Sequence, residues 1–275
     1  MEQIKFFKMS GSGNDFIIID NRAKVVDDKE LTNFISNVCR RKMSVGADGV
    51  ILLENAEKVD FKWRFFNSDG STAEMCGNGA RCVARFAFLN KITGPEMSFE
   101  TDAGIVHAQI TEDGAKIKTT DPSDLKIDYK IKLENRAFTI SSINTGVPHV
   151  VIEVDELEDV PVNKIGREIR SHEMFAPAGT NVNFIHLGKD DIIAIRTYER
   201  GVENETLACG TGAIASAIVM ADKAAVESPV KMMTRSGGFL YVYYEEKQGR
   251  YYNVYLDGDA RLIYQAQLSE DAWKE

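Results

Sequence analysis

The sequence lacks the features that mark membrane, secreted and disulfide-rich proteins. No run approaches the roughly 20 consecutive apolar residues of a membrane-spanning helix. Residues 1–5 lack the basic-then-apolar layout of a signal peptide, so a cytoplasmic location is expected. The chain has only four cysteines among 275 residues. A reducing cytoplasm disfavours structural disulfides between them.

Motifs for nucleic acids, metals and cofactors are also missing. The net charge of −9 disfavours nucleic acid, because phosphate binding needs a basic face. No CxxC pair occurs, and Cys76 and Cys82 point to different faces of one predicted helix, which argues against zinc. The GSGN segment at 11–14 is followed by neither Gly-Lys-Ser/Thr nor a predicted helix, so it matches neither phosphate-binding motif. No lysine lies in a pyridoxal motif. We therefore expect a small-molecule substrate with no cofactor and no metal.

What the sequence does contain is a repeated pentapeptide. Residues 76–80 (CGNGA) recur at 209–213 (CGTGA), and each copy follows a predicted strand and opens a helical run of small and apolar residues. The same spacing of 133 residues relates Gly13 to Gly146, Gly46 to Gly179 and Gly104 to Gly237. Shared glycine positions predict shared backbone geometry, so the pattern indicates an internal duplication and not a solenoid.

Two copies predict two pseudo-symmetric domains of about 130 residues each. Many short strands with one long helix per half favour an α+β class, in which each domain is a curled mixed or antiparallel sheet around a central helix. We expect an N-terminal domain over residues 1–122, with segment 265–275 packing back on it, and a C-terminal domain over 123–264. The active site is expected in the cleft between them. Helix 213–221, apolar except for Ser216, is typical of a buried helix, whereas Arg81 and Arg85 should form a polar edge of the first helix.

Each repeated cysteine is predicted to lie at a helix N-terminus. Unpaired backbone N–H groups and the helix dipole favour anions there, and should lower the thiol pKa from its free value of ~8.5. Two equivalent thiols on opposite faces of one carbon suit inversion of a stereocentre α to a carboxylate. One thiolate would remove the proton and the other thiol would deliver one from the far side.

Other interpretations of the two thiols stay open at this point. A Cys–His hydrolase would use one thiol and leave the other idle. A proline-racemase-like enzyme would share the paired thiols, and a metabolite-binding or redox-sensing module would pair them reversibly without turnover. Two buried cysteines that only pack would do none of these. Because facing thiols of low pKa oxidise readily, we expect inactivation in air and rescue by reductant.

Three blocks of the sequence resemble the diaminopimelate epimerase family. They are residues 8–16 (KMSGSGNDF), the segments 66–70 and 76–82, and the segments 198–201 and 205–212. The resemblance covers nearly the whole chain. It implies the family's fold and a cofactor-independent isomerase that interconverts LL- and meso-2,6-diaminopimelate, on the route to lysine and peptidoglycan units. A homodimer is common in the family.

The resemblance also implies roles for individual residues. Cys76 and Cys209 would form the proton-transfer pair, while His149 and Glu199 would tune the thiols and position the reacting amino group. The remaining histidines, His107, His172 and His186, match nothing and are expected to be structural or exposed. The polar distal residues argue against a proline-like substrate, which has no distal amino-carboxylate group. The implied substrate-binding set is Asn14, Asn67, Gly77, Asn78, Asn181, Glu199, Arg200, Gly210 and Thr211.

The chain departs from the family pattern at two residues and in one loop. Gly49 stands where many members carry Gln, and Val147 stands where many carry Asn before the Pro-His pair. The loop between Glu199 and Cys209 is one residue longer than in some members. We expect two polar contacts to the distal end of the substrate to be lost, with the acid–base chemistry unchanged.

Overall fold

The computed structural model describes residues 4–133 and 136–274. Its internal contacts divide the chain into two compact units. Unit 1 comprises Met1–Ile117 and Gly258–Glu275, and unit 2 comprises Lys118–Asp257. The domain boundaries predicted from the sequence, after residues 122 and 264, lie a few residues C-terminal to the observed boundaries after Ile117 and Asp257.

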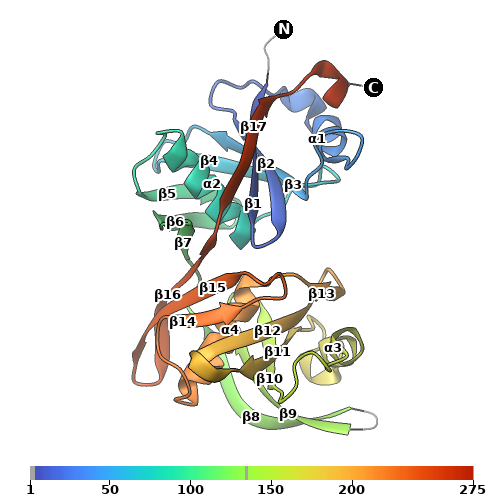
Figure 1. The fold of residues 1–275 in the computed structure, drawn as a ribbon, viewed down its shortest axis with the longest axis vertical. Coiled ribbons are helices and arrows are strands. Elements are labelled where there is room, and N and C mark those ends of the chain that lie inside the picture. The colour runs from blue at the N-terminus through green and yellow to red at the C-terminus, as the bar shows by residue number, and fades with distance from the viewer. Residues whose placement is uncertain (1–3, 134–135, 275) are drawn as a thin grey trace. The chain divides into compact units, whose positions relative to one another are not determined.

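Unit 1 is a mixed sheet that curls around helix α2 (Gly77–Leu89) (Figure 1). Strand β2 (Asn14–Asp20) pairs antiparallel with β1 (Lys5–Gly11) and parallel with β3 (Gly49–Glu54). The order continues through β4 (Phe61–Asn67), antiparallel to β3, and β5 (Glu96–Thr101), parallel to β4. Antiparallel strands β6 (Gly104–Ile110) and β7 (Gly114–Lys118) follow, and the distant β17 (Arg261–Gln267) pairs antiparallel with β1.

Alternation along β2 produces two cores in unit 1. Phe16 and Ile18 belong to the cluster around α2, whereas Ile17 and Ile19 pack with helix α1 (Leu31–Cys39). This is the period-2 pattern of a strand buried on both faces. The two helices therefore cover opposite faces of this sheet, and the first cysteine lies directly before the start of α2.

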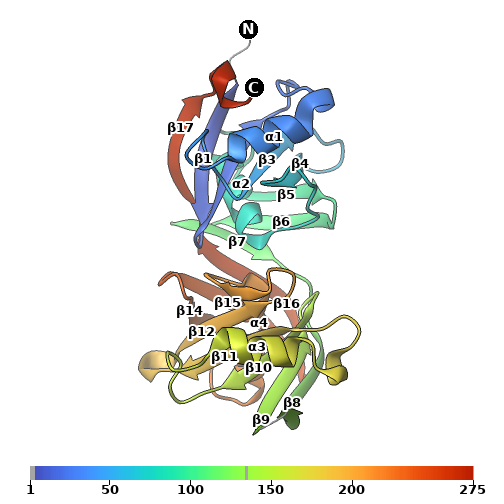
Figure 2. The same cartoon turned by 90° about the vertical axis from the view of Figure 1, so that its right-hand side faces the viewer.

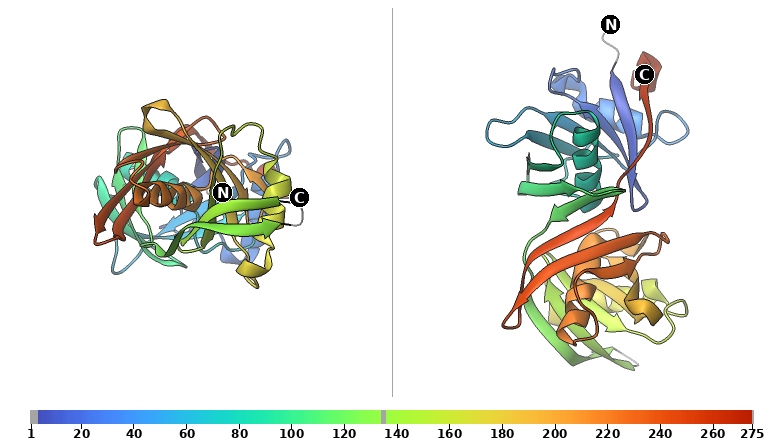
Figure 3. Two further views of the ribbon diagram at one scale, coloured as in Figure 1. Left: turned by 90° about the horizontal axis from the view of Figure 1, so that it is seen from below. Right: turned by 60° about the vertical axis from the view of Figure 1, so that its left-hand side comes forward.

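Unit 2 repeats this plan around helix α4 (Gly210–Asp222) (Figure 3, right). Strand β10 (Pro148–Glu153) pairs parallel with β11 (Asn181–Leu187) and antiparallel with β9 (Arg136–Asn144), which pairs with β8 (Ser123–Leu133). Strand β12 (Ile192–Glu199) lies antiparallel to both β11 and the short β13 (Asn204–Thr206). It lies parallel to β14 (Val230–Met233), whose other neighbour is β15 (Phe239–Lys247), and β16 (Arg250–Asp259) follows.

Helix α3 (Val162–Arg170) occupies in unit 2 the position that α1 occupies in unit 1. It packs on Val150, Val182 and Phe184, while α4 packs on Val151 and Ile185 from the other face (Figure 2). Short 3₁₀ turns complete the fold at Asp28–Glu30, Glu173–Phe175, Lys189–Asp191 and Glu270–Ala272. Among the described residues, no helix is both long enough and apolar enough to cross a membrane.

The backbone confirms the duplication that the glycines predict. All three glycine pairs have positive φ in both units, and helices α2 and α4 have the same length of 13 residues and begin directly after the two cysteines. The predicted α+β class is confirmed. The φ values are 94° and 97° at Gly13 and Gly146, 75° and 70° at Gly46 and Gly179, and 117° and 78° at Gly104 and Gly237.

The two central helices differ in how they are buried. Helix α4 is buried from Gly212 to Met220, Ser216 included, as its composition predicts. In α2 the expectation of a polar edge is wrong for Arg81, which has no exposed surface. Its guanidinium donates to Ser12 Oγ at 2.8 Å and to the carbonyl oxygen of Asp259 at 3.3 Å. Those acceptors come from distant segments of unit 1, so the helix sequence alone does not predict them.

Candidate active site

Cys209 is the residue immediately before α4, and its thiol accepts hydrogen bonds from the start of that helix. The backbone N–H groups of Thr211 and Gly212 donate to Sγ and lower the thiol pKa. Sγ also lies 3.5 Å from Thr211 Oγ1. These contacts are the ones expected of a residue at a helix N-terminus.

The pKa of Cys209 nevertheless moves in the direction opposite to our expectation. Burial is the largest cause, the charge of Glu199 is the second, and together they raise the pKa of Cys209 to about 12. The predicted lowering is therefore wrong for Cys209, because desolvation and a neighbouring carboxylate outweigh the helix contacts. Cys209 is a neutral thiol in this structure and carries a proton that it can donate.

Glu199, the last residue of β12, completes this corner of the site. Burial raises the pKa of its carboxyl group, and the neighbouring side chains of Thr206 and Cys209 act in the opposite direction. The carboxyl group of Glu199 therefore lies beside a protonated thiol in unit 2.

Cys76 precedes α2 as Cys209 precedes α4, but it is less buried. Gly77 has open space where a side chain would be, and a Cβ added to Gly79 would lie 3.6 Å from Cys76 Cβ. The first turn of α2 thus carries no bulky group beside the thiol. The other two cysteines are buried, and burial raises the pKa of Cys39 to about 12 and that of Cys82 well above its usual range. Those thiols pack in the core.

A chain of hydrogen bonds orients two predicted substrate-binding residues of unit 1. Arg81 donates to Asn78 Oδ1 at 2.7 Å, so Asn78 Nδ2 is left to donate to Asn14 Oδ1 at 2.6 Å. Asn14 Nδ2 then donates to Asp48 at 3.0 Å. A buried cation at one end and a carboxylate at the other fix both amide orientations.

Asn67 lies on the same edge of unit 1. It ends β4 opposite Gly49, which itself pairs with Phe16 on β2, and its side chain donates to Ser71 Oγ at 3.0 Å. Gly49 has a steric reason to be glycine. A Cβ there would lie 2.5 Å from the carbonyl oxygen of Phe66 and 2.7 Å from the Phe65 ring, so no side chain fits without movement of both.

In unit 2, Asn181 and Arg200 are held by each other and by the backbone. Asn181 Oδ1 accepts from the backbone N–H of Arg200 at 2.9 Å, and Asn181 Nδ2 donates to the carbonyl oxygen of Pro148 at 3.1 Å. The Arg200 side chain donates to the carbonyl oxygen of Ala178 at 3.1 Å. Val147 lies in the adjoining turn, where its carbonyl accepts from the backbone N–H of Thr145.

His149 lies beside Asn181 in the parallel pairing of β10 and β11 and is almost completely buried. Its Nδ1 lies 3.1 Å from Asn183 Nδ2, and Asn183 Oδ1 accepts from Thr197 Oγ1 at 2.9 Å. Burial, with a smaller contribution from the charge of Arg200, lowers the pKa of His149 to about 3. His149 is therefore a neutral imidazole.

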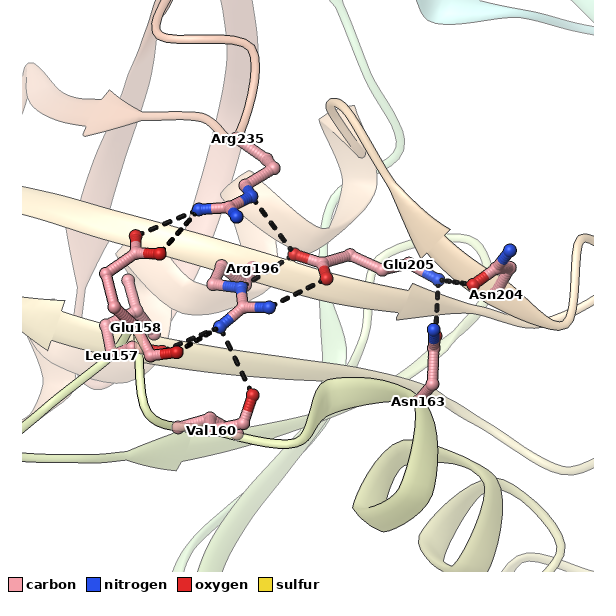
Figure 4. A network of polar contacts seen from close by, with 8 residues as sticks. All are labelled: Leu157, Glu158, Val160, Asn163, Arg196, Asn204, Glu205 and Arg235. Carbon is pink, nitrogen blue, oxygen red and sulfur yellow. Dashed lines mark hydrogen bonds and ion pairs between the residues drawn. The ribbon is translucent and has the colours of Figure 1, made fainter.

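A second polar network fixes the segment that leads to Cys209 (Figure 4). Buried Arg196 on β12 donates to both carboxylate oxygens of Glu205, at 2.7 and 2.8 Å, and to the carbonyl oxygens of Leu157, Glu158 and Val160. The backbone N–H of Glu205 donates to Asn163 at 2.8 Å. Arg235 connects Glu158 to Glu205 from above in this view. Strand β13, whose Glu205 lies four residues before Cys209, is thus anchored by a bidentate ion pair.

The structure gathers the predicted residues into two sets, one in each unit. Unit 1 holds Asn14, Asn67, Cys76, Gly77 and Asn78, and unit 2 holds the rest. His107 is exposed, and His172 and His186 are half-buried and hydrogen-bond to backbone carbonyls, as expected for structural or exposed residues. The sequence-based interpretation missed Arg81, Asn183, Thr197 and Arg196. For Asn183 a signal was present, since it is an amide inside the apolar run 182–185 and two residues after Asn181.

Known proteins match this chain over nearly its whole length. A sequence profile of the family described as Diaminopimelate epimerase matches residues 6–125 and 141–263. The Diaminopimelate epimerase of Aquifex aeolicus is 46% identical over 98% of this chain and 99% of its own length. Among solved structures, a phenazine biosynthesis protein of the PhzF family from Bacillus anthracis has a TM-score of 0.72 at 17% identity, over 98% of this chain and 100% of its own. A probable proline racemase from Agrobacterium radiobacter has a TM-score of 0.68 at 14% identity, over 98% and 94%. The two structures share the fold.

Proposed function

This chain belongs to the diaminopimelate epimerase family, and on that premise we propose that it interconverts LL- and meso-2,6-diaminopimelate by inverting one α-carbon without a cofactor. The observation that carries the proposal is the equivalence of the two cysteines. Each stands directly before a 13-residue helix at matching positions of a duplicated fold. Inversion by two-base proton transfer needs a proton acceptor and a proton donor on opposite faces of the carbon, and the duplication supplies two equivalent candidates.

The reaction balances with these two sulfurs alone. One thiolate takes the α-proton, and the electron pair of the broken C–H bond moves into the substrate carboxylate to form an enolate-like intermediate. The thiol on the opposite face then gives its proton to the α-carbon, and the electron pair returns to form the new C–H bond. The two sulfurs exchange protonation states in each turnover, so the reverse reaction follows the same route.

Helix N-termini stabilise the charge that develops in this reaction. The backbone N–H groups of Gly77 and Asn78, and those of Gly210 and Thr211, belong to the first turns of α2 and α4 and have no intrahelical acceptors. We assign them to the substrate's reacting carboxylate, which gains negative charge as the proton leaves. The small side chains at these positions support the assignment, because an anion must approach the backbone closely.

In this proposal, Glu199 sets the protonation state of Cys209, and His149 contributes a neutral polar group. Glu199 keeps Cys209 protonated until the substrate binds, and it accepts the Cys209 proton when that sulfur must act as the base. His149 provides a neutral polar group in the interior next to Asn181. The amides of Asn14, Asn67 and Asn181, with Arg200, bind the distal amino and carboxylate groups of the substrate. Glu199 also contacts the reacting amino group.

The oriented amides support this assignment over an epimerase for proline-like substrates. Asn14 and Asn78 are held by a hydrogen-bond chain that starts at buried Arg81, which is a costly arrangement unless both amides serve recognition. A ring substrate with one carboxylate has no second polar end to use them. Because Gly49 provides no amide, distal recognition rests on the remaining polar side chains.

We also propose a cytoplasmic homodimer. Thiols that must stay reduced suit a reducing compartment. For the dimer, the support is the set of exposed apolar side chains on β17, where Leu262, Ile263 and Tyr264 are 42%, 54% and 43% exposed. Sedimentation should give twice the chain mass for the native protein and the chain mass for Ile263→Asp. A native monomer contradicts the dimer.

The proposed activity is tested with purified, reduced protein and LL-diaminopimelate. The expected product is the meso isomer, separated by chromatography after chiral derivatisation, with an equilibrium ratio approached from either side. L-proline is the control substrate, and it should not be racemised. Racemisation of proline with no reaction of diaminopimelate overturns the substrate assignment, and no reaction of either overturns the epimerase.

A further inference from the structure

We propose that Asn183 is a positioning residue that holds His149 as the neutral imidazole protonated on Nε2, so that His149 acts in the reaction as a hydrogen-bond donor and not as a proton acceptor. The assignment of the tautomer follows from contacts within unit 2. Its use in catalysis rests on the proposed epimerase function.

The orientation of the Asn183 amide is the first step. One of its terminal atoms lies 2.9 Å from the carbonyl oxygen of Val150, which can only accept. That atom must therefore be the nitrogen, and the other, facing Thr197 Oγ1 at 2.9 Å, must be the oxygen. Thr197 and Asn183 are both buried, so water does not offer an alternative set of partners.

The second step transfers this orientation to the imidazole. The nitrogen of Asn183 carries two hydrogens. One is donated to the carbonyl oxygen of Val150, and the other faces His149 Nδ1, which lies 3.1 Å from Asn183 Nδ2. Nδ1 must accept this hydrogen bond with its lone pair. A proton on Nδ1 would place two donors against each other in the interior, without room for water between them. The neutral ring consequently carries its proton on Nε2.

The third step concerns the free end of the ring. Nε2 is buried and, among the residues that the structure describes, has no hydrogen-bond partner. An N–H donor left unpaired in the interior is destabilising, so this atom points to a missing acceptor. Burial also lowers the pKa of His149, in agreement with a ring that stays neutral. The acceptor that suits a neutral donor in this reaction is an anion, either a thiolate or a substrate carboxylate.

The network belongs to one copy of the duplication only. The residues of unit 1 at structurally equivalent positions are Phe16 for His149 and Ile51 for Asn183, both buried in the apolar cluster around α2. In unit 2 the amide also touches the catalytic helix, since a Cβ on Gly212 would lie 2.3 Å from Asn183 Oδ1. A buried polar group present in one copy, packed against the helix of Cys209, indicates a function that the fold itself does not require.

The test is a long-range ¹⁵N–¹H correlation spectrum of uniformly ¹⁵N-labelled protein at neutral pH, which distinguishes the two neutral tautomers and the imidazolium. His149→Gln assigns the signals. His186 is an internal control, because its Nδ1 lies 3.0 Å from the carbonyl oxygen of Val154 and must carry a proton. We expect opposite patterns, with Nε2–H for His149. An Nδ1–H or imidazolium pattern for His149 overturns the proposal.

Asn183→Asp provides the matched variant, because a carboxylate replaces the amide donor with an acceptor of the same shape. In this variant the His149 proton should appear on Nδ1, and kcat should fall at least about tenfold. A folded variant with an unchanged His149 spectrum contradicts the proposal. If Asn183→Asp does not fold, the native spectrum decides alone. The spectrum needs no turnover, so failure of the epimerase assay and failure of the tautomer assignment are separate results.

Discussion

The side chains of Glu199 and Cys209 are neighbours beside the first turn of α4, and each shifts the pKa of the other. The charge of Glu199 adds to burial in raising the pKa of Cys209 to about 12, against the opposing effect of two backbone N–H donors. A helix N-terminus by itself would favour the thiolate. Burial and the carboxylate together therefore keep the thiol protonated before substrate binds.

Glu199→Gln tests this relationship. The substitution keeps the shape and removes the charge, so the pKa of Cys209 should fall, and alkylation of Cys209 should begin at lower pH than in the native protein. Peptide mapping by mass spectrometry after iodoacetamide treatment follows Cys76 and Cys209 separately. Cys76 in the same sample is the control. An alkylation profile of Cys209 that is the same in both proteins contradicts the role of the charge.

Two glycines at equivalent positions provide a matched pair of substitutions. In Gly212→Ala the new Cβ would lie 2.3 Å from Asn183 Oδ1, an amide held by three buried partners, whereas in Gly79→Ala the nearest atom is the flexible end of Ile51 at 3.2 Å. We expect Gly212→Ala to destabilise the protein by about 1–3 kcal/mol, as overpacking does. Gly79→Ala should be within about 1 kcal/mol of the native protein, because alanine favours the helix.

Urea denaturation measures both free energies of unfolding, and the epimerase assay measures both rates. We expect the native protein and Gly79→Ala to have similar free energies of unfolding, and Gly212→Ala to have a lower one. The kcat of Gly212→Ala should also be at least about tenfold lower than that of the other two proteins. Equal losses in the two variants would mean that Asn183 is not fixed as described.

His149 predicts a pH dependence of stability. Its pKa is about 3 in the folded protein, against an ordinary value of 6.5, so the unfolded chain binds a proton that the folded protein excludes between these values. Stability should therefore fall as the pH decreases from about 6.5 toward 3, by on the order of 5 kcal/mol from this group. Above about pH 6.5 the group should contribute no pH dependence.

The measurement is the free energy of unfolding of native protein and His149→Gln across this pH range. The difference between the two should shrink with falling pH, since glutamine does not titrate. Asp15, whose pKa is lowered to about 2 by Arg41 and Lys8 despite its burial, contributes equally to both proteins. Parallel curves would show that His149 does not carry the expected pH dependence.

Several features of the fold could be predicted from the sequence because they depend on local pattern. Glycine adopts positive φ without the steric cost that other residues bear, so pairs such as Gly46 and Gly179 predicted the duplication from the sequence alone. The apolar composition of α4 likewise predicted its burial. The repeated cysteines also predicted both helix N-termini, because the start of a helix depends on the local sequence pattern.

The features that the sequence did not predict depend on partners distant along the chain. Arg81 is charged and was expected on a polar edge, but Ser12, Asn78 and Asp259 supply its acceptors in the interior. The Cys209 pKa depends on burial and on Glu199, which no local pattern reveals. Asn183 lies inside an apolar run, and only the pairing of β10, β11 and β12 brings it to His149 and Thr197.

The central claim, that two thiols share one inversion, is tested most directly by solvent exchange. Native protein, Cys76→Ala and Cys209→Ala are each incubated with LL-diaminopimelate in deuterium oxide, and the epimer ratio and α-deuterium are followed by NMR. We predict meso product with deuterium at the inverted α-carbon from native protein, and no epimerisation by either variant. Full epimerisation by one of the two variants would contradict the account, because a single thiol would then suffice.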